Sequence, residues 1–283
     1  MRKSIFDIAS QSINISNEVD RIVAMSLKEH NIYYLQRYTL FEYVDKYCFQ
    51  SWIHRGHFLD VKDMLEAVNY NDIKAKAKKG DIDAFMTLIE LTYNLWALAN
   101  KVVKKRNSSC HGQNNYQHLH TVMLDNLEKY NHKIFECDDR FLVVEDKPEV
   151  TAVAEVVDQS LALDVIKYNH RSLQGEVELK KTILLTMGAE IEPRRDELEQ
   201  LNKQLASDIF FMLNNMNVRH NNCNESDASK YRKYVAEMDK QQLEEWYDEL
   251  YQMLLLAILL LDHTSRTAKI KVLKADIAKT ANS

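Results

Sequence analysis

Glycine and proline are scarce in this chain, which has 5 Gly and 2 Pro in 283 residues. Both residue types interrupt helices, and glycine also supplies the positive φ angles that many tight turns need. Their scarcity excludes collagen-like and turn-rich β architectures. The composition therefore predicts an all-α fold in the form of a helical bundle, with a length that suits one large domain or two smaller ones.

Cysteine pairs and long apolar runs are also missing. The four cysteines, Cys48, Cys110, Cys137 and Cys223, form no CxxC pair, which argues against a disulfide framework. The longest apolar run, Met253 to Leu261, is about half of a membrane span and is typical of a buried helix. The first residues become polar too early for a secretory signal. We therefore expect a cytoplasmic protein that does not contact a membrane.

A strong positive charge is absent as well. The formal net charge is −5 and the isoelectric point is about 6.1, so nucleic acid would have to be bound by a local basic patch. The clearest patch comprises Lys101, Lys104, Lys105 and Arg106. Hydrophobic residues make up 46% of the chain, which is enough for a folded core.

Apolar residues at helical spacing are the dominant pattern of the chain. A stripe of aromatic residues between Tyr33 and Trp52 belongs to one expected helix and is typical of a buried core. Gly80 and Asp81 precede a long amphipathic helix, for which Asp81 is the expected cap. The expected helices cover 3–28, 31–55, 60–68, 71–79, 81–105, 114–134, 158–186, 190–217, 227–238, 240–263 and 265–279.

Residues 136–157 differ from the rest, because they contain an acidic turn and β-branched residues that partly alternate. We expect a linker or a small hairpin there, between an N-terminal helical unit at 1–135 and a C-terminal helical unit at 158–283. In both units a long helix runs into a polar break that contains an arginine, and another helix follows. This order favours two related halves, although unrelated helical hairpins share the same pattern.

The polar break of the first unit begins Arg106-Asn107 and continues to His111-Gly112. RNA can be cleaved without a metal when its own 2′-hydroxyl attacks the adjacent phosphorus. A histidine suits the proton transfers of this reaction, and a guanidinium group binds the charged phosphoryl oxygens. On a continuous helix Arg106 and His111 would be roughly 140° apart. A helix end near Ser108 and Gly112 would bring them together.

This arrangement resembles the signature of the HEPN superfamily, in which an arginine precedes a histidine by a short spacing at the end of a long helix. The resemblance implies a HEPN-like helical bundle and a metal-independent endoribonuclease that acts in phage defence, in abortive infection or as a toxin. It implies that Arg106, Asn107 and His111 are catalytic. It also implies RNA as substrate, a homodimer in which two motifs meet, and an antitoxin or other partner protein.

The second unit repeats the signature only in part. Arg219-His220 resembles the arginine and its polar neighbour, but Asn224, Glu225 and Ser226 stand where a histidine is expected. We assign Arg219 and His220, together with Lys101, Lys104 and Lys105, to RNA binding.

Two other interpretations stay open. The same sequence features also fit a non-catalytic HEPN-like binding or scaffold module. They fit as well an unrelated helical interaction protein in which Arg106 and His111 are surface residues. A metal site is not expected, because His118 and His120 are two residues apart on a predicted helix and point in different directions. No cofactor motif is present either.

Overall fold

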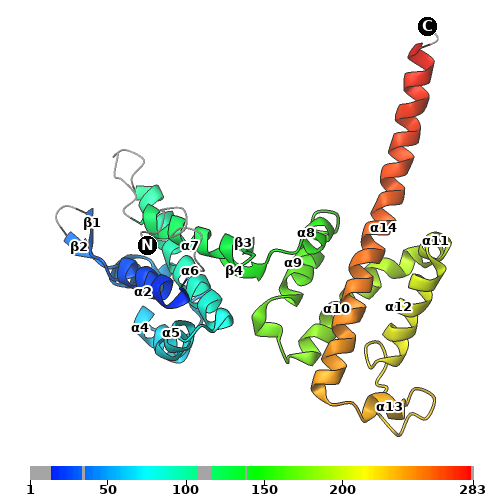
Figure 1. Cartoon of the computed structure of the whole chain (residues 1–283), viewed down its shortest axis with the longest axis horizontal. Coiled ribbons are helices and arrows are strands. Elements are labelled where there is room, and N and C mark those ends of the chain that lie inside the picture. Colours follow the sequence, from blue (N-terminus) through cyan, green and yellow to red (C-terminus); the bar gives the residue numbers. More distant parts are fainter. Residues whose placement is uncertain (1–13, 34–35, 107–115, 138, 282–283) are drawn as a thin grey trace, which may run out of the picture. The chain divides into compact units, whose positions relative to one another are not determined.

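The computed structural model of the chain describes residues 14–33, 36–106, 116–137 and 139–281 (Figure 1). It divides into two compact units, Met1–Glu145 and Asp146–Ser283, and each unit is described by itself. Helices make up 71% of the structure, which confirms the expectation of a mostly helical protein. The division between the units falls after Glu145, inside the segment 136–157.

Unit 1 contains helices and two antiparallel hairpins, β1–β2 and β3–β4. Its described elements are α2 (Ile15–Ser26), β1 (His30–Tyr33), β2 (Gln36–Tyr38), α3 (Leu40–Tyr47), the 3-10 helix η1 (Phe49–Ser51), α4 (Val61–Ala67), α5 (Tyr70–Lys78), α6 (Ile82–Arg106), α7 (Gln117–Lys129), β3 (His132–Cys137) and β4 (Arg140–Glu145).

Helix α6 is the centre of unit 1. Its side chains Phe85, Leu88, Ile89 and Leu95 are fully buried, and α2, α3, α5, α7 and β4 all pack against it. The Asp81 carboxylate caps the helix by accepting a hydrogen bond from the Ala84 N–H at 2.9 Å, as the sequence predicts. The core is therefore built around the helix that leads into the Arg106 motif.

The prediction of one helix over 31–55 is wrong. The chain forms the hairpin β1–β2 first, and α3 begins only at Leu40. The Thr39 hydroxyl accepts from the Glu42 N–H at 3.2 Å, and the Glu42 carboxylate accepts from the Thr39 N–H at 2.9 Å. This capping box starts the helix, and the sequence Thr-x-x-Glu was the local signal for it. The aromatic stripe alone could not show the helix start, because aromatic residues also suit strands.

The second hairpin, β3–β4, spans 132–145, so it begins four residues before the segment 136–157 and within the end of the helix expected at 114–134. It pairs His132 with Glu145 at its open end and Cys137 with Arg140 at its turn. Asp139 has φ +63 in this turn, a left-handed conformation that Asp adopts more readily than most residues. The β-branched residues after Pro148 form helix α8 (Pro148–Ala154), which begins with proline in its first turn.

Unit 2 has helices but no strands within its described residues, and residues 216–232 form irregular turns. Besides α8, its elements are α9 (Gln159–Tyr168), the 3-10 helix η2 (Arg171–Leu173), α10 (Val177–Ile191), the 3-10 helix η3 (Glu192–Arg194), α11 (Arg195–Leu201), α12 (Lys203–Asn215), α13 (Lys233–Ala236) and α14 (Lys240–Ala281). The expected helices at 158–186 and 190–217 are each interrupted, the first near Gly175 with φ +75 and the second at Asn202, which caps α12.

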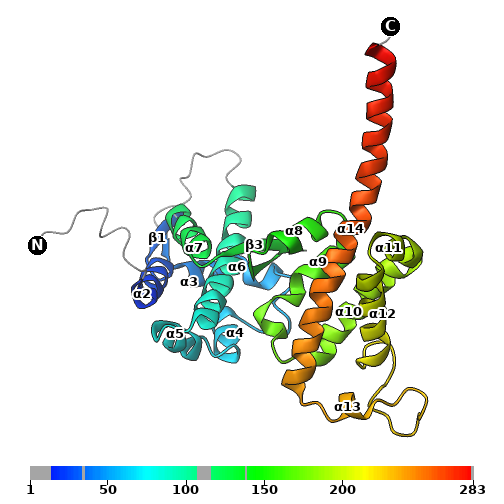
Figure 2. The ribbon, with the colours of Figure 1, turned by 45° about the vertical axis from the view of Figure 1, so that its right-hand side comes forward.

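Helix α14 dominates unit 2. It is continuous where two helices were expected at 240–263 and 265–279, because the sequence between Lys240 and Ala281 contains neither glycine nor proline. Its buried face includes Tyr247, Leu250 and Leu254, each at 0% exposure, and packs against α8, α10, α11 and α12. Figures 1 and 2 show its C-terminal part extending past these neighbours.

Among the helices of the described ranges, none combines the length and the apolar character that crossing a membrane requires.

Candidate functional site

The Arg106 motif lies at the C-terminal end of α6, the buried central helix of unit 1. The backbone of α6 is described up to Arg106. The side chains of Lys104, Lys105 and Arg106, and the whole of Asn107 and His111, lie outside the described residues. The catalytic assignment of Arg106, Asn107 and His111 therefore stays a prediction, and the described site is what surrounds the last turns of α6.

Lys101 is the member of the expected basic patch whose side chain is described. Its ammonium group lies 2.7 Å from the Asp139 carboxylate, and the two side chains are 49% and 52% exposed. Asp139 belongs to the turn of the β3–β4 hairpin. The ion pair therefore joins α6 to the hairpin turn. Lys101 lies about 7.5 Å along the helix axis before Arg106. Because a half-exposed ion pair of this kind is weak, another anion can replace the Asp139 carboxylate beside Lys101.

A cavity of about 670 Å³ lies beside Lys101 within unit 1. Its walls are the segment after η1, one face of α6, and the β3–β4 hairpin. Aromatic rings and amide groups predominate among its lining residues, which are Ser51, Trp52, Ile53, Tyr93, Asn94, Trp96, Ala97, Leu98, Asn100, Lys101, Glu136, Asp139 and Phe141.

The hairpin wall of this cavity is held by two polar side chains of α6. The Asn94 amide donates to the Phe141 carbonyl at 2.7 Å and accepts from the Phe141 N–H at 3.0 Å. One turn earlier, the Glu90 carboxylate accepts from the Val143 N–H at 2.6 Å. One edge of β4 has no neighbouring strand to bond its backbone groups. The Asn94 and Glu90 side chains bond the Phe141 and Val143 backbone groups on that edge instead.

Two lining side chains of the inner wall, Tyr93 and Trp96, pack against a histidine of α7 that lies behind them. The rings of Trp96 and His120 stack with centroids 4.1 Å apart, and the Tyr93 hydroxyl lies 3.3 Å from His120 Nε2. The Trp96 indole N–H donates to the Tyr116 carbonyl at 3.2 Å. Burial, and then the nearby Glu136 carboxylate, raise the pKa of Tyr93 above its usual value.

His120 was not among the site residues expected from the sequence, because it comes from α7 and meets α6 only through the fold. The partly exposed rings of the cavity wall are those of Trp52 and Phe141, which share the lining with the Lys101 cation. Such a surface can hold a planar heterocyclic ring by stacking and an adjacent anion by charge.

Arg219 and His220 lie in unit 2, after the end of α12. The Arg219 guanidinium forms an ion pair with Glu192 and lies 5.5 Å from the centroid of the Phe210 ring. His220 is half-buried, and its carbonyl accepts from the Asn222 N–H at 2.9 Å. Arg219 therefore ties the end of α12 to η3, and a phosphate bound there would compete with Glu192.

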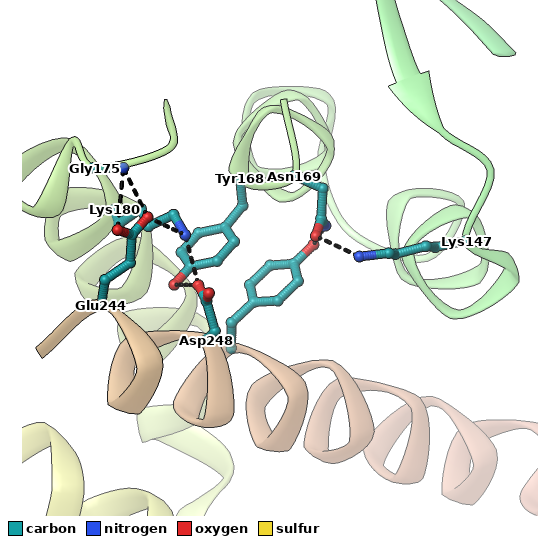
Figure 3. A network of polar contacts seen from close by, with 8 residues as sticks. Lys147, Tyr168, Asn169, Gly175, Lys180, Glu244 and Asp248 are labelled. Atoms are coloured by element: carbon teal, nitrogen blue, oxygen red, sulfur yellow. Dashed lines mark hydrogen bonds and ion pairs between the residues drawn. The ribbon is translucent and has the colours of Figure 1, made fainter. Parts of the chain in front are cut away.

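A second polar cluster of unit 2 surrounds Lys180, which the sequence did not single out (Figure 3). The Lys180 side chain is only 7% exposed, and its ammonium group lies 2.8 Å from Glu244 and 2.7 Å from Asp248. Tyr168 donates to Asp248 at 2.9 Å, and the Gly175 N–H donates to Glu244 at 2.9 Å. This network links α9 and α10 to α14 and places every one of these charges beside a partner, which is the arrangement of a structural cluster.

The pKa values within the Lys180 network follow from burial and hydrogen bonding. Burial by itself raises the pKa of Glu244, but the hydrogen bonds from Lys180 and the Gly175 N–H outweigh it and hold the pKa below its usual value. Burial, with the charge of Asp248, raises the pKa of Tyr168. Tyr168 stacks on Tyr251 with ring centroids 4.0 Å apart. The network is therefore most stable with Glu244 ionised and Tyr168 neutral.

Metal ligands do not converge within the described ranges, where no group of three His, Cys, Asp or Glu side chains is placed to hold an ion. Cys110 and His111 lie outside those ranges. No protein-family model, no curated protein and no solved structure matches the chain.

Proposed function

We propose that the chain is a metal-independent endoribonuclease of the HEPN type, which acts in phage defence, in abortive infection or as a toxin. Its active site comprises Arg106, Asn107 and His111, which follow directly on the helix that forms the centre of unit 1. The observation that supports this best is the cavity along the last turns of α6, next to Lys101 and one to three turns before Arg106.

The cavity suits one base of an RNA strand whose phosphates run towards the end of α6. Trp52 and Phe141 supply partly exposed ring faces, and stacking on such rings tolerates any base. Lys101 supplies a cation that can exchange Asp139 for a backbone phosphate. The scissile phosphate then lies beyond Lys101, where Lys104, Lys105 and Arg106 follow in the sequence.

The reaction needs Arg106, Asn107 and two proton transfers at the RNA. The 2′-oxygen forms a bond to phosphorus while the bond from phosphorus to the 5′-oxygen breaks. The 2′-hydroxyl gives its proton to His111 of one copy, and the leaving 5′-oxygen takes a proton from His111 of a second copy. Arg106 binds the phosphoryl oxygens as their charge increases, and Asn107 positions the reacting groups. The products carry a 2′,3′-cyclic phosphate and a 5′-hydroxyl.

One complete motif per chain favours a homodimer in which two sets of Arg106 and His111 face the same RNA. The second unit carries Arg219 and His220 without the following histidine, so it contributes RNA contacts and no separate active site. An antitoxin or other partner protein would restrain such an activity in the cell.

Incubation of the purified chain with single-stranded RNA in excess EDTA tests the proposal. The wild type should yield fragments with cyclic phosphate ends, and His111→Ala should lower the rate by about 100-fold or more. His118→Ala, seven residues later on the exposed side of α7, is the matched control and should cleave normally. Equal cleavage by the wild type and by His111→Ala would reject the proposed active site.

A non-catalytic binding or scaffold module is the second candidate. Two basic side chains of the expected RNA surface are described, Lys101 and Arg219. Each forms an ion pair with an acidic residue of its own unit, and this pairing favours the alternative. RNA or protein binding without any RNA turnover would support this alternative.

A further inference from the structure

Helix α14 has a second apolar stripe, on the side opposite its buried face. The residues of this outer stripe alternate at spacings of three and four, the heptad spacing of helices that pair with another helix. They are Trp246, Glu249, Met253, Leu256, Leu260, His263, Thr267, Ile270, Lys274 and Ile277. Several are large apolar side chains with high exposure: Trp246 at 45%, Leu256 at 48%, Ile270 at 47% and Ile277 at 58%.

The N-terminal end of the outer stripe, Trp246, Glu249 and Met253, forms one wall of a groove between α12 and α14. The groove has a volume of about 790 Å³ and is lined by Asp208, Phe211, Met212, Glu245, Trp246, Glu249 and Met253. Phe211 is 62% exposed. An apolar floor with a rim of carboxylates fits an amphipathic helix that carries lysines.

The carboxylates of the groove rim are not neutralised within the described part of the chain. Asp208 accepts from the Gln204 amide at 2.8 Å and Glu245 from the Gln241 amide at 3.1 Å. None of Asp208, Glu245 and Glu249 is within ion-pair distance of a described lysine or arginine. The rim therefore has an excess of negative charge that a basic partner can balance.

The C-terminal part of α14 carries lysines and exposed apolar side chains, which complement the carboxylates and the apolar floor of the groove. Residues 266–277 carry Lys269, Lys271 and Lys274 besides the exposed Ile270, Leu273 and Ile277. Helix α14 is one continuous helix, so its own Lys274 lies roughly 37 Å along the axis from Glu249. A chain therefore cannot place this segment in its own groove without breaking α14, whereas a second copy can supply it.

We propose that two copies of this chain pair through α14 in antiparallel orientation, so that residues 266–277 of each copy lie in the α12–α14 groove of the other. The register places Trp246 opposite Ile277 of the second copy, Met253 opposite Ile270, and Glu249 opposite Lys274. In a parallel pair Glu249 would face Glu249 and Lys274 would face Lys274, so like charges oppose that orientation.

The antiparallel pairing is reciprocal. Each copy gives one helix end and receives one, and the two contacts are related by a twofold axis near residues 261 and 262, so the assembly closes as a dimer. The interface lies entirely within unit 2 and does not involve the Arg106 motif. It would hold whether or not the chain cleaves RNA.

Sedimentation velocity of the full-length chain over a range of concentrations tests the pairing. The wild type should form a dimer. Glu249→Lys and Lys274→Glu should each raise the dimer dissociation constant by about tenfold or more, because each places like charges in contact twice per dimer. The chain carrying both substitutions should return to within about threefold of the wild type, because the charges at positions 249 and 274 are then exchanged and again opposite in sign.

Lys269→Glu is the matched control, because it makes the same change of charge roughly 140° around the helix axis from Lys274, away from the outer stripe. It should leave the dimer dissociation constant within about threefold of the wild type. Equal weakening by Lys269→Glu and Lys274→Glu, or failure of the combined variant to recover, would overturn the register. A monomeric wild type would overturn the dimer, and binding of that monomer to phosphatidylserine vesicles would assign the lysines to a membrane instead. Circular dichroism should show unchanged helix content in all variants.

Discussion

The side-chain amide of Asn94 on α6 forms two hydrogen bonds with the backbone of Phe141, one to its carbonyl at 2.7 Å and one from its N–H at 3.0 Å. These bonds fix the β3–β4 hairpin as a wall of the cavity. A substitution at Asn94 is therefore expected to affect both stability and the cavity.

Asn94→Ala should destabilise unit 1 by about 1–3 kcal/mol, because it removes the side chain that bonds both backbone groups of Phe141. Hydrogen exchange of the Phe141 amide should become faster, whereas the Val143 amide, which Glu90 holds, should change less. Unchanged protection of Phe141 would contradict this role of Asn94.

Lys180→Ala should destabilise the protein by about 3–5 kcal/mol, because it leaves Glu244 and Asp248 close together without their cation. The neighbouring Lys181 offers a control, since it pairs with Glu178 at 3.9 Å and its partner is 81% exposed. Lys181→Ala should cost less than about 1 kcal/mol. Urea unfolding measures both values, and similar losses for the two variants would refute the structural role of Lys180.

Acid should weaken the Lys180 network. The pKa of Glu244 is lower in the folded chain than in the unfolded chain. The stabilisation by ionised Glu244 is therefore complete above the unfolded pKa of about 4.3 and is lost as the pH falls through the lower folded pKa. Glu244→Gln should be less stable at neutral pH and should lose less further stability on acidification. Glu178→Gln should follow the pH profile of the wild type. Urea unfolding at a series of pH values measures these profiles.

Trp52→Ala should weaken the binding of single-stranded RNA by about 1–3 kcal/mol, the contribution of one stacked base. Trp52→Phe keeps an aromatic face and should recover most of the affinity. Fluorescence anisotropy with a labelled oligonucleotide gives the dissociation constants. If Trp52→Ala binds as tightly as the wild type, the cavity does not hold a base.

The sequence predicted the extent of α6 well, but it divided α14 and joined the shorter helices at 158–186 and at 190–217. The scarcity of glycine and proline and the apolar spacing after Asp81 gave α6 closely, because a local cap and a local periodicity suffice to define such a helix. The division of the last helix at 264 was wrong for the same physical reason, since nothing between Lys240 and Ala281 interrupts it. At 31–55 the aromatic spacing predicts one helix, but the capping box of Thr39 and Glu42 starts α3 only at Leu40.

By itself the sequence thus determined a mostly helical chain, the extent of its central helix α6 and the place of Arg106 at the end of that helix. Only the tertiary structure decided that Asn94 and Glu90 hold a hairpin, that His120 stacks on Trp96, and that Lys180 is buried between two carboxylates. The reason is that helix formation depends on neighbours within a few residues, whereas these contacts join residues 24 to 68 positions apart, and no local pattern encodes which faces will meet.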